Sequence, residues 1–316
     1  MKSRIFLLFI VVVSCLFVAT EAKKTKQWKF MNWNKYQKAT IGVGSVWDKT
    51  WGISKHGGWL WFWKGADKLK NVVVRDPTKK TKDLVLRVVY PYKSINPESS
   101  TVGGLGFLAQ PLKIDKNDRI VSLQYNIFFP KGFNFARGGK LPGLYGGHGD
   151  CTGGSSDSGC FTTRLMWRDK GIGEVYAYLP DSAQRQNLCD DKVNICNPDY
   201  GFSLGRGSFK FPTGKWFSVR QIITLNTAGK RNGKLDIYLG GKKVMSEKDL
   251  VFRKKSSDRV VGISKFKDFH FFFFFNFINF FFVVFHTFFG GSDWSWRSPK
   301  TQYSYFKNFY LKTSTS

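Results

Sequence analysis

Residues able to do chemistry gather in three short motifs near the middle of the sequence: "GGKLPGLYGGHGDC" (138–151), "CFTTRLMWR" (160–168) and "GEVYAYLP" (173–180). In the first motif, Lys140 lies among six glycines. Glycine and proline allow the backbone to follow a tight path close to a ligand. We therefore expect a rigid setting that fixes the direction of the Lys140 ammonium group; the alternative is a surface loop with a solvated lysine.

The second and third motifs predict a β-hairpin with a five-residue turn, Asp169 to Gly173. This turn would set three cross-strand pairs: Arg168 with Glu174, Met166 with Tyr176, and Arg164 with Tyr178. Alternate side chains share a face, so one polar face carries Thr162, Arg164, Met166, Arg168, Glu174, Tyr176 and Tyr178. The opposite face is a core set: Thr163, Leu165, Trp167, Val175, Ala177 and Leu179. We expect the polar face to be exposed to solvent.

A cationic face with phenols suits β-elimination on a polymer of uronic acids. The C5 proton of a uronate lies beside a carboxylate, and its removal becomes feasible when arginine or lysine neutralises that charge. A tyrosine whose pKa is lowered by neighbouring cations could take the proton. The same tyrosine or a second one could protonate the leaving glycosidic oxygen. This route needs neither a metal nor a cofactor.

Glycoside hydrolysis would need two carboxylates across the scissile bond. The chain has only four glutamates, and Glu174 alone lies among the candidate site residues. A serine-type triad lacks support because no G-x-S-x-G motif occurs. These absences favour elimination over hydrolysis.

The N-terminus predicts a secretory signal peptide, residues 1–22. Lys2 and Arg4 precede an apolar run, 5–17, that is too short to span a bilayer, and small residues follow at a spacing that suits cleavage. We expect the remainder, 23–316, to form a single domain in a secreted, extracellular protein.

Charge and cysteine content agree with secretion. The formal charge of +28 becomes +27 without the signal peptide and attracts polyanions. Secretion makes an acidic polysaccharide the expected partner, with no nucleic acid and no membrane, and we expect a monomer. Four cysteines remain, and they allow three disulfide pairings. We favour Cys151–Cys160 and Cys189–Cys196, because each pair closes a short local loop.

Strand signals dominate the chain, and no long segment has helical periodicity. We predict strands over 71–76, 83–90, 120–129, 161–168, 173–180, 216–226, 234–241 and 303–312. Many short strands without helices between them predict an all-β sandwich or jelly roll. The aromatic run "WLWFWK" (59–64) fits either a core strand or a platform for stacking sugars.

One segment departs from this pattern. Residues 266–289 hold 14 of the 32 phenylalanines. Within them, we interpret residues 266–285 as an anomalous Phe-rich insert. Four explanations stay open: a membrane span, a buried strand pair, an aggregation-prone insert, or a gene-model error such as an unspliced intron. We favour the gene-model error, because a core needs side chains of varied shape.

The three motifs, together with "GKWFSVRQIITLNTAGKRNGKLDIYLGG" and "FFGGSDWSW", resemble the alginate and glucuronan lyases of polysaccharide lyase family fourteen. The cysteine-bearing form is similar to the secreted digestive alginate lyases of marine molluscs. The resemblance extends from "YPYKSINP" (90–97) to "YFKNFYLK" (305–312), without the Phe-rich segment. It implies a jelly-roll β-sandwich of two antiparallel sheets with a concave substrate groove.

The resemblance also implies roles for matching residues. The catalytic set is Lys140, Arg164, Tyr176 and Tyr178, and the substrate-binding set is Thr162, Arg168, Glu174 and His148. Whether Lys140 or a tyrosine is the base stays open, and His148 is either a sugar ligand or an ordinary loop residue. The expected activity is β-elimination of alginate. The alternatives are a glucuronan lyase, a non-catalytic lectin for acidic glycans, and a cationic defence protein acting on anionic membranes.

Overall fold

The computed structural model describes residues 24–31, 33–36, 46–53, 69, 71–97, 99–114, 117–147, 151, 159–190, 192–197, 200–255, 281–291 and 293–315. Four features predicted from sequence lie outside these residues: the signal peptide 1–22, the aromatic run 59–64, His148, and positions 266–280 of the Phe-rich segment.

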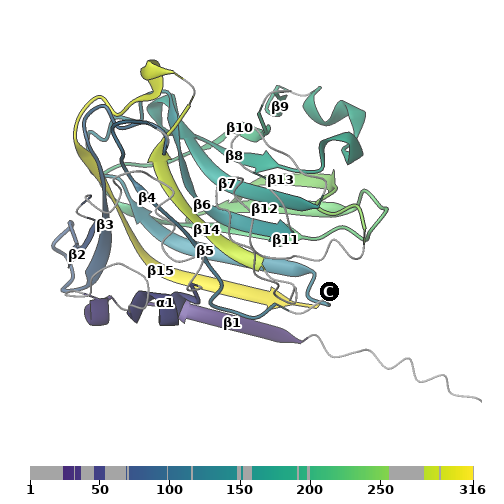
Figure 1. Ribbon diagram of the computed structural model, residues 1–316, viewed down its shortest axis with the longest axis horizontal. Helices are drawn as coiled ribbons and strands as arrows, with labels where there is room; N and C mark the ends of the chain where they lie inside the picture. Colours follow the sequence, from purple (N-terminus) through teal and green to yellow (C-terminus); the bar gives the residue numbers. More distant parts are fainter. Residues whose placement is uncertain are drawn as a thin grey trace, which may run out of the picture.

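Two antiparallel sheets stack face to face (Figure 1). Sheet A has the order β13 (Lys242–Leu250), β12 (Gly233–Leu239), β11 (Trp216–Thr224), β5 (Ile120–Phe128), β15 (Gln302–Ser314), β3 (Leu84–Tyr90) and β2 (Val72–Arg75), with β1 (Thr25–Phe30) also paired to β15. Sheet B has the order β4 (Leu105–Ala109), β14 (Phe281–Phe289), β6 (Gly138–Gly147), β7 (Cys160–Arg168), β8 (Ile172–Tyr178), β10 (Phe202–Lys210) and β9 (Ile195–Cys196). The predicted jelly-roll sandwich is confirmed.

Helices are short in the described part of the chain. They are α1 (Val46–Trp51) and the 3₁₀ turns η1 (Asn34–Tyr36), η3 (Asp169–Gly171), η4 (Asp181–Ala183), η5 (Gln186–Cys189) and η6 (Trp294–Trp296). None of the helices in the described ranges is long and apolar enough to cross a membrane.

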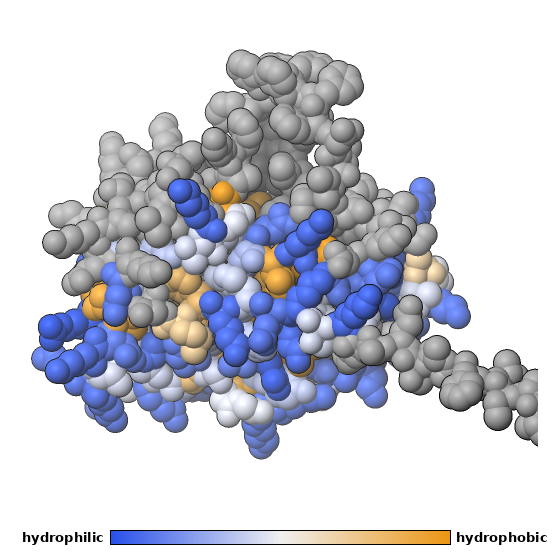
Figure 2. Space-filling model, turned by 90° about the horizontal axis from the view of Figure 1, so that it is seen from below, coloured by the Kyte–Doolittle hydropathy of each residue, from blue (hydrophilic) through white to orange (hydrophobic). Residues whose placement is uncertain are grey.

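Alternating side chains build the core between the sheets. Along β5 and β11, half-buried and buried residues alternate, as the two-residue period of a strand with one covered face requires. The buried side includes large rings such as Trp167, which packs edge-on against Phe129 and Phe289. Where its residues are described, the face of the molecule on the side of β1 is mainly hydrophilic (Figure 2). The hydrophobic pattern therefore decides which face of sheet A looks outward.

The eight strands predicted from sequence are all present, as β2, β3, β5, β7, β8, β11, β12 and β15. Seven others were not predicted, and β6 is the most important of them. The sequence analysis did not predict a strand in this glycine-rich stretch, but residues 138–147 form a fully buried strand between β14 and β7. Glycine also suits a strand that neighbouring chains approach closely.

The end of the Phe-rich segment belongs to the sheet. Residues 281–285, which the sequence assigned to the insert, lie in β14 and pair with both β4 and β6. Phe285 stacks on Phe107 with ring centroids 4.6 Å apart, and Phe289 is also buried in the core. Some of the rings in this stretch are therefore used as ordinary core side chains.

Candidate active site

The lysine strand β6 is shaped by its neighbours. A side chain at Gly139 would meet the indole of Trp167, and one at Gly143 would overlap the carbonyl oxygen of Thr163. Pro142 cannot donate to a ladder, and the pairing of β6 with both neighbouring strands shifts register near it. The glycines thus let two strands close on β6, and the irregularity follows directly after Lys140.

The β7–β8 hairpin has a shorter turn than predicted. β7 ends at Arg168 and β8 begins at Ile172, with η3 between them. The observed pairs are therefore Thr162 with Tyr178, Arg164 with Tyr176, and Met166 with Glu174. The predicted register was wrong by two residues. Because side chains repeat every two residues, an even slip keeps each one on its predicted face.

The predicted core set of the hairpin is buried between the sheets. The opposite face, expected to be wet, is also largely buried. Its exposed fractions are 4% for Arg164, 3% for Tyr178 and 9% for Lys140. Together with Met166, Arg168, Glu174 and Tyr176, these residues form what we call the catalytic face, after the role that the sequence predicts for it. Its ionisable groups lie in a largely desolvated environment where charges interact strongly.

Lys140 sits at the centre of the catalytic face. Its Nζ lies 3.9 Å from the centroid of the Tyr176 ring and donates a hydrogen bond to the sulfur of Met166 at 3.0 Å. Burial, and then the charges of Arg164 and Arg168, hold the pKa of Lys140 well below its ordinary value of 10.5. Glu174 opposes this shift only in part. The environment favours the neutral amine, which can accept a proton.

The two tyrosines lie next to each other on β8. Their ring centroids are 5.7 Å apart, and the guanidinium carbon of Arg164 lies 5.8 Å from the centroid of the Tyr178 ring. Burial and the neighbouring Tyr178 raise the pKa of Tyr176, although a backbone hydrogen bond from Gly201 and the charge of Arg164 oppose the rise. The expectation that cations lower this pKa was wrong for Tyr176, because desolvation outweighs them.

Glu174 holds two arginines. Its carboxylate is fully buried and accepts hydrogen bonds from Arg168 at 2.6 Å, Arg206 at 2.7 Å and the Ser203 hydroxyl at 2.7 Å. Burial opposes its ionisation, yet the two arginines hold the pKa of Glu174 below its ordinary value. A carboxylate bound in this way stays ionised and orients Arg168 beside the lysine.

Three residues of this region were missed by sequence reasoning. His286 on β14 places Nδ1 3.4 Å from a terminal nitrogen of Arg164, and burial followed by the Arg164 charge lowers its pKa to about 3. Ser203 and Arg206 come from β10, which the sequence did not predict. His286 was overlooked because the Phe-rich segment around it had been set apart, although "VVFHTFF" itself has the composition of a strand.

The first disulfide lies against the catalytic face. Cys151 and Cys160 are joined as predicted, with their Cα atoms 6.0 Å apart. Both cysteines are buried in a cluster with Tyr145 and Tyr178. Thr162, fully buried, donates its hydroxyl to the carbonyl of Cys151 at 2.8 Å. This threonine therefore fastens the backbone of Cys151 to β7.

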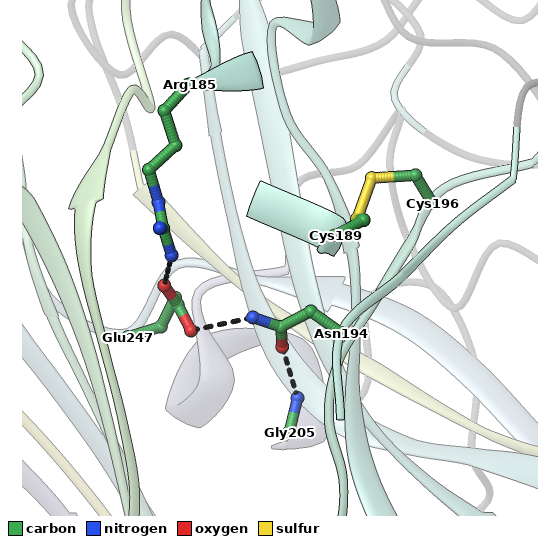
Figure 3. The surroundings of a disulfide bond; sticks show 6 residues. All are labelled: Arg185, Cys189, Asn194, Cys196, Gly205 and Glu247. Carbon is green, nitrogen blue, oxygen red and sulfur yellow. Dashed lines mark hydrogen bonds and ion pairs between the residues drawn. A yellow bond between two sulfur atoms is a disulfide. The ribbon is translucent and has the colours of Figure 1, made fainter. Parts of the chain in front are cut away.

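The second disulfide, Cys189–Cys196, also forms as predicted and fastens the loop before β10. Next to it, Asn194 accepts a hydrogen bond from the backbone of Gly205 and donates one to Glu247 on β13 (Figure 3). Arg185 extends this side-chain network through a 2.6 Å ion pair with Glu247. This network ties the edge of sheet B to the edge of sheet A.

Comparisons with known proteins agree with this fold. A sequence model of the family described as polysaccharide lyase 14 matches residues 78–273, more than half of the chain. The marine PL-14 alginate lyase from Aplysia kurodai is similar in structure, with 29% identity, a TM-score of 0.64, and coverage of 90% of this chain and 97% of that one. The alginate lyase vAL-1 from Chlorella virus has 26% identity and a TM-score of 0.61 over 77% and 89% of the two chains.

A third structure, a mutant of alginate lyase Aly36B in complex with alginate tetrasaccharide, shares the fold at 20% identity and a TM-score of 0.57, over 90% of this chain and 96% of that one. A comparison with curated protein sequences found no match. The match to the family model and the two-sheet fold lead to one conclusion: the chain belongs to polysaccharide lyase family 14, and it is a polysaccharide lyase.

Proposed function

We propose that this protein cleaves alginate by β-elimination, with Lys140, Arg164, Tyr176 and Tyr178 as its catalytic residues. The substrate is suggested by the relatives from Aplysia kurodai and Chlorella virus, both alginate lyases with 25–30% identity to this chain. The single observation that carries the chemistry is the position of the Lys140 amine, 3.9 Å above the Tyr176 ring and under the charges of the buried Arg164 and the partly buried Arg168.

Lys140 is the base in this proposal. Its neutral amine takes the C5 proton of a uronate, and the electrons left behind form a double bond between C4 and C5 as the C4–O bond breaks. The depressed pKa of Lys140 supports this role, because a base must be deprotonated near the working pH. The lowered pKa of Lys140 therefore supports the lysine, rather than a tyrosine phenolate, as the base.

Arg164 neutralises the substrate carboxylate, so that the negative charge that develops on proton removal is stabilised. His286 stays uncharged beside it, since its pKa is about 3, and does not add a further cation. A tyrosine hydroxyl protonates the leaving glycosidic oxygen. The raised pKa of Tyr176 supports this part of the proposal, because its phenol keeps a proton to donate. Arg168, oriented by Glu174, binds a neighbouring carboxylate of the polymer.

Hydrolysis remains unsupported. A glycosidase needs a carboxylic acid that donates a proton and a second carboxylate opposite it. Within the described residues, Glu174 is the carboxylate beside Lys140, and two arginines hold it ionised. A carboxylate with its charge fixed in this way is a poor proton donor.

The test follows the ultraviolet absorbance of the conjugated double bond formed when the mature protein is mixed with alginate. Wild type should produce this signal, and Lys140→Ala and Tyr176→Phe should lose it while still binding the polymer. Binding by wild type without new absorbance would instead favour a lectin. Full activity in both variants would refute the site assignment.

Secretion is part of the proposal. It is supported by the two disulfides, which form in oxidising compartments, and by the signal-like residues 1–22. The expected monomer, without nucleic-acid or membrane partners, stays a prediction.

A further inference from the structure

A second region combines an aromatic ring, lysines and a hollow, on the outward face of sheet A. The hollow has a volume of about 580 Å³. It is lined by Asn126, Trp216 and Ser218 from β5 and β11, by Lys210 at the end of β10, and by Lys215 in the β10–β11 connection. Trp216 and Ser218 alternate along β11 with Phe217 and Val219, which belong to the core. The hollow therefore opens away from the core, whereas the catalytic face lies on sheet B.

The tryptophan of this hollow is held in a fixed position. Its indole nitrogen donates to both carboxylate oxygens of Asp76, at 3.0 and 2.9 Å. The amine of Lys307 lies 4.5 Å from the ring centroid and forms a 2.9 Å ion pair with the same carboxylate. Three strands, β11, β15 and the end of β2, thus contribute to holding one half-buried ring. An immobilised aromatic ring loses little entropy when a ligand stacks on it.

Cations and aromatics continue beside the hollow. Arg220 lies two residues beyond Ser218 on β11 and opposite Tyr238 on β12, with its guanidinium carbon 4.1 Å from the centroid of that ring. Lys243, the partner of Tyr238 on β13, lies 5.5 Å from the same centroid. Ser218, which lines the hollow, lies on the same face of the sheet as Arg220 and Tyr238. The surface therefore extends from the hollow across β11, β12 and β13 as one strip, which we call the outer strip.

The charge of the outer strip is positive. The lining of the hollow contains two lysines and no acidic residue. Nearby, Asp76 is already bound by Lys307, and Asp236 is bound by Lys234 and Lys243. A ligand for this surface must offer anionic groups at intervals and an apolar face for the aromatic rings.

We propose that the outer strip, centred on the hollow beside Trp216, is a second, non-catalytic binding site for an acidic polysaccharide chain. The C–H face of a uronate ring packs on Trp216, and its carboxylate and that of the next sugar meet Lys210 and Lys215. The identity of the polymer as alginate rests on the proposed function. Because this site and the catalytic face look away from each other, one long polymer held here raises the local concentration of substrate at the catalytic face.

The experiment measures polymer binding in a Lys140→Ala background, so that the substrate stays intact. Lys210→Ala/Lys215→Ala is compared with Lys192→Ala/Lys230→Ala, which removes the same charge from two exposed lysines that do not line the hollow. Affinity electrophoresis in alginate gels should show binding weakened about tenfold by the first pair, equivalent to about 1.4 kcal/mol, and less than twofold by the control pair. Trp216→Ala should weaken binding further, if thermal unfolding shows that it remains folded.

In the active enzyme, the Lys210→Ala/Lys215→Ala pair should raise KM for polymeric alginate several-fold. Its KM for an alginate tetrasaccharide should equal that of the Lys192→Ala/Lys230→Ala control. Equal binding by both lysine pairs would overturn the proposal. An equal rise of KM for polymer and tetrasaccharide would also overturn it, because the hollow would then belong to the catalytic groove. A shift from dimer to monomer in sedimentation, caused by the first pair alone, would assign the strip to self-association. Failure of the proposed function itself would appear separately, as wild type without any absorbance signal.

Discussion

The catalytic face and the outer strip use the same kinds of residues with opposite electrostatic results. Each places a lysine beside a tyrosine ring, Lys140 at 3.9 Å from Tyr176 and Lys243 at 5.5 Å from Tyr238. Burial and two arginines lower the pKa of Lys140, whereas a hydrogen bond from Lys243 to Asp236 raises the pKa of the exposed lysine. Residue type alone therefore does not decide whether a lysine can transfer a proton or remains a cation. Its access to solvent and the sign of the nearest charge decide this, because they set its pKa.

The largest test of this comparison removes the buried amine. Lys140→Ala should reduce kcat on alginate about 10³-fold, the usual contribution of a positioned general base. Lys230→Ala removes an exposed lysine in the β11–β12 turn and should leave kcat unchanged. Both rates come from the ultraviolet assay. A loss below tenfold for Lys140→Ala would mean that another group is the base.

The next test compares two carboxylates that each bind two cations. Glu174 is fully buried, so Glu174→Gln leaves Arg168 and Arg206 without a counter-charge and should cost about 3 kcal/mol of unfolding free energy. Asp236 binds Lys234 and Lys243, which are more exposed, so Asp236→Asn should cost about 1 kcal/mol or less. Urea unfolding of the two variants measures the difference. An equal loss of unfolding free energy in the two variants would show that burial of the carboxylate does not cause the difference between the two faces.

A third test asks by how much the buried amine of Lys140 lowers the free energy of unfolding. Lys140→Met should raise the unfolding free energy at neutral pH by about 1 kcal/mol, because a desolvated amine is replaced by an apolar side chain. The pKa of Lys140 is lower in the folded than in the unfolded chain, so the unfolded state binds more protons between the two values. Wild type should gain stability as pH rises through that window, and Lys140→Met should lack this slope. A destabilised variant would argue that the amine is well solvated.

The smallest expected effect is a shift in the pH profile. Since kcat/KM reports the free enzyme, it should rise with pH as Lys140 loses its proton, at a pH well below 10.5. Glu174 raises the pKa of Lys140, so Glu174→Gln should move this limb to lower pH. Asp236→Asn, on the other face, should leave the limb in place. A limb that moves to higher pH in Glu174→Gln would contradict the assigned electrostatics.

Sequence reasoning went furthest where periodicity was clear. The alternation in β7 and β8 assigned each side chain to a face, and this assignment survived a two-residue error in register. The even number of cysteines and their short spacings indicated both disulfides. The strand that carries Lys140 was not predicted, because composition does not reveal how closely β14 and β7 approach Gly139 and Gly143.

The sequence by itself determined the all-β class, the disulfide pairing and the set of residues that share a face with Arg164, because these depend on local spacing and on a two-residue period. Tertiary structure alone decided that this face is buried, that Lys140 lies between Tyr176 and Met166, and that His286 joins it from β14. Desolvation and the approach of charges from distant strands decide pKa values, and both arise only when the two sheets have closed on each other.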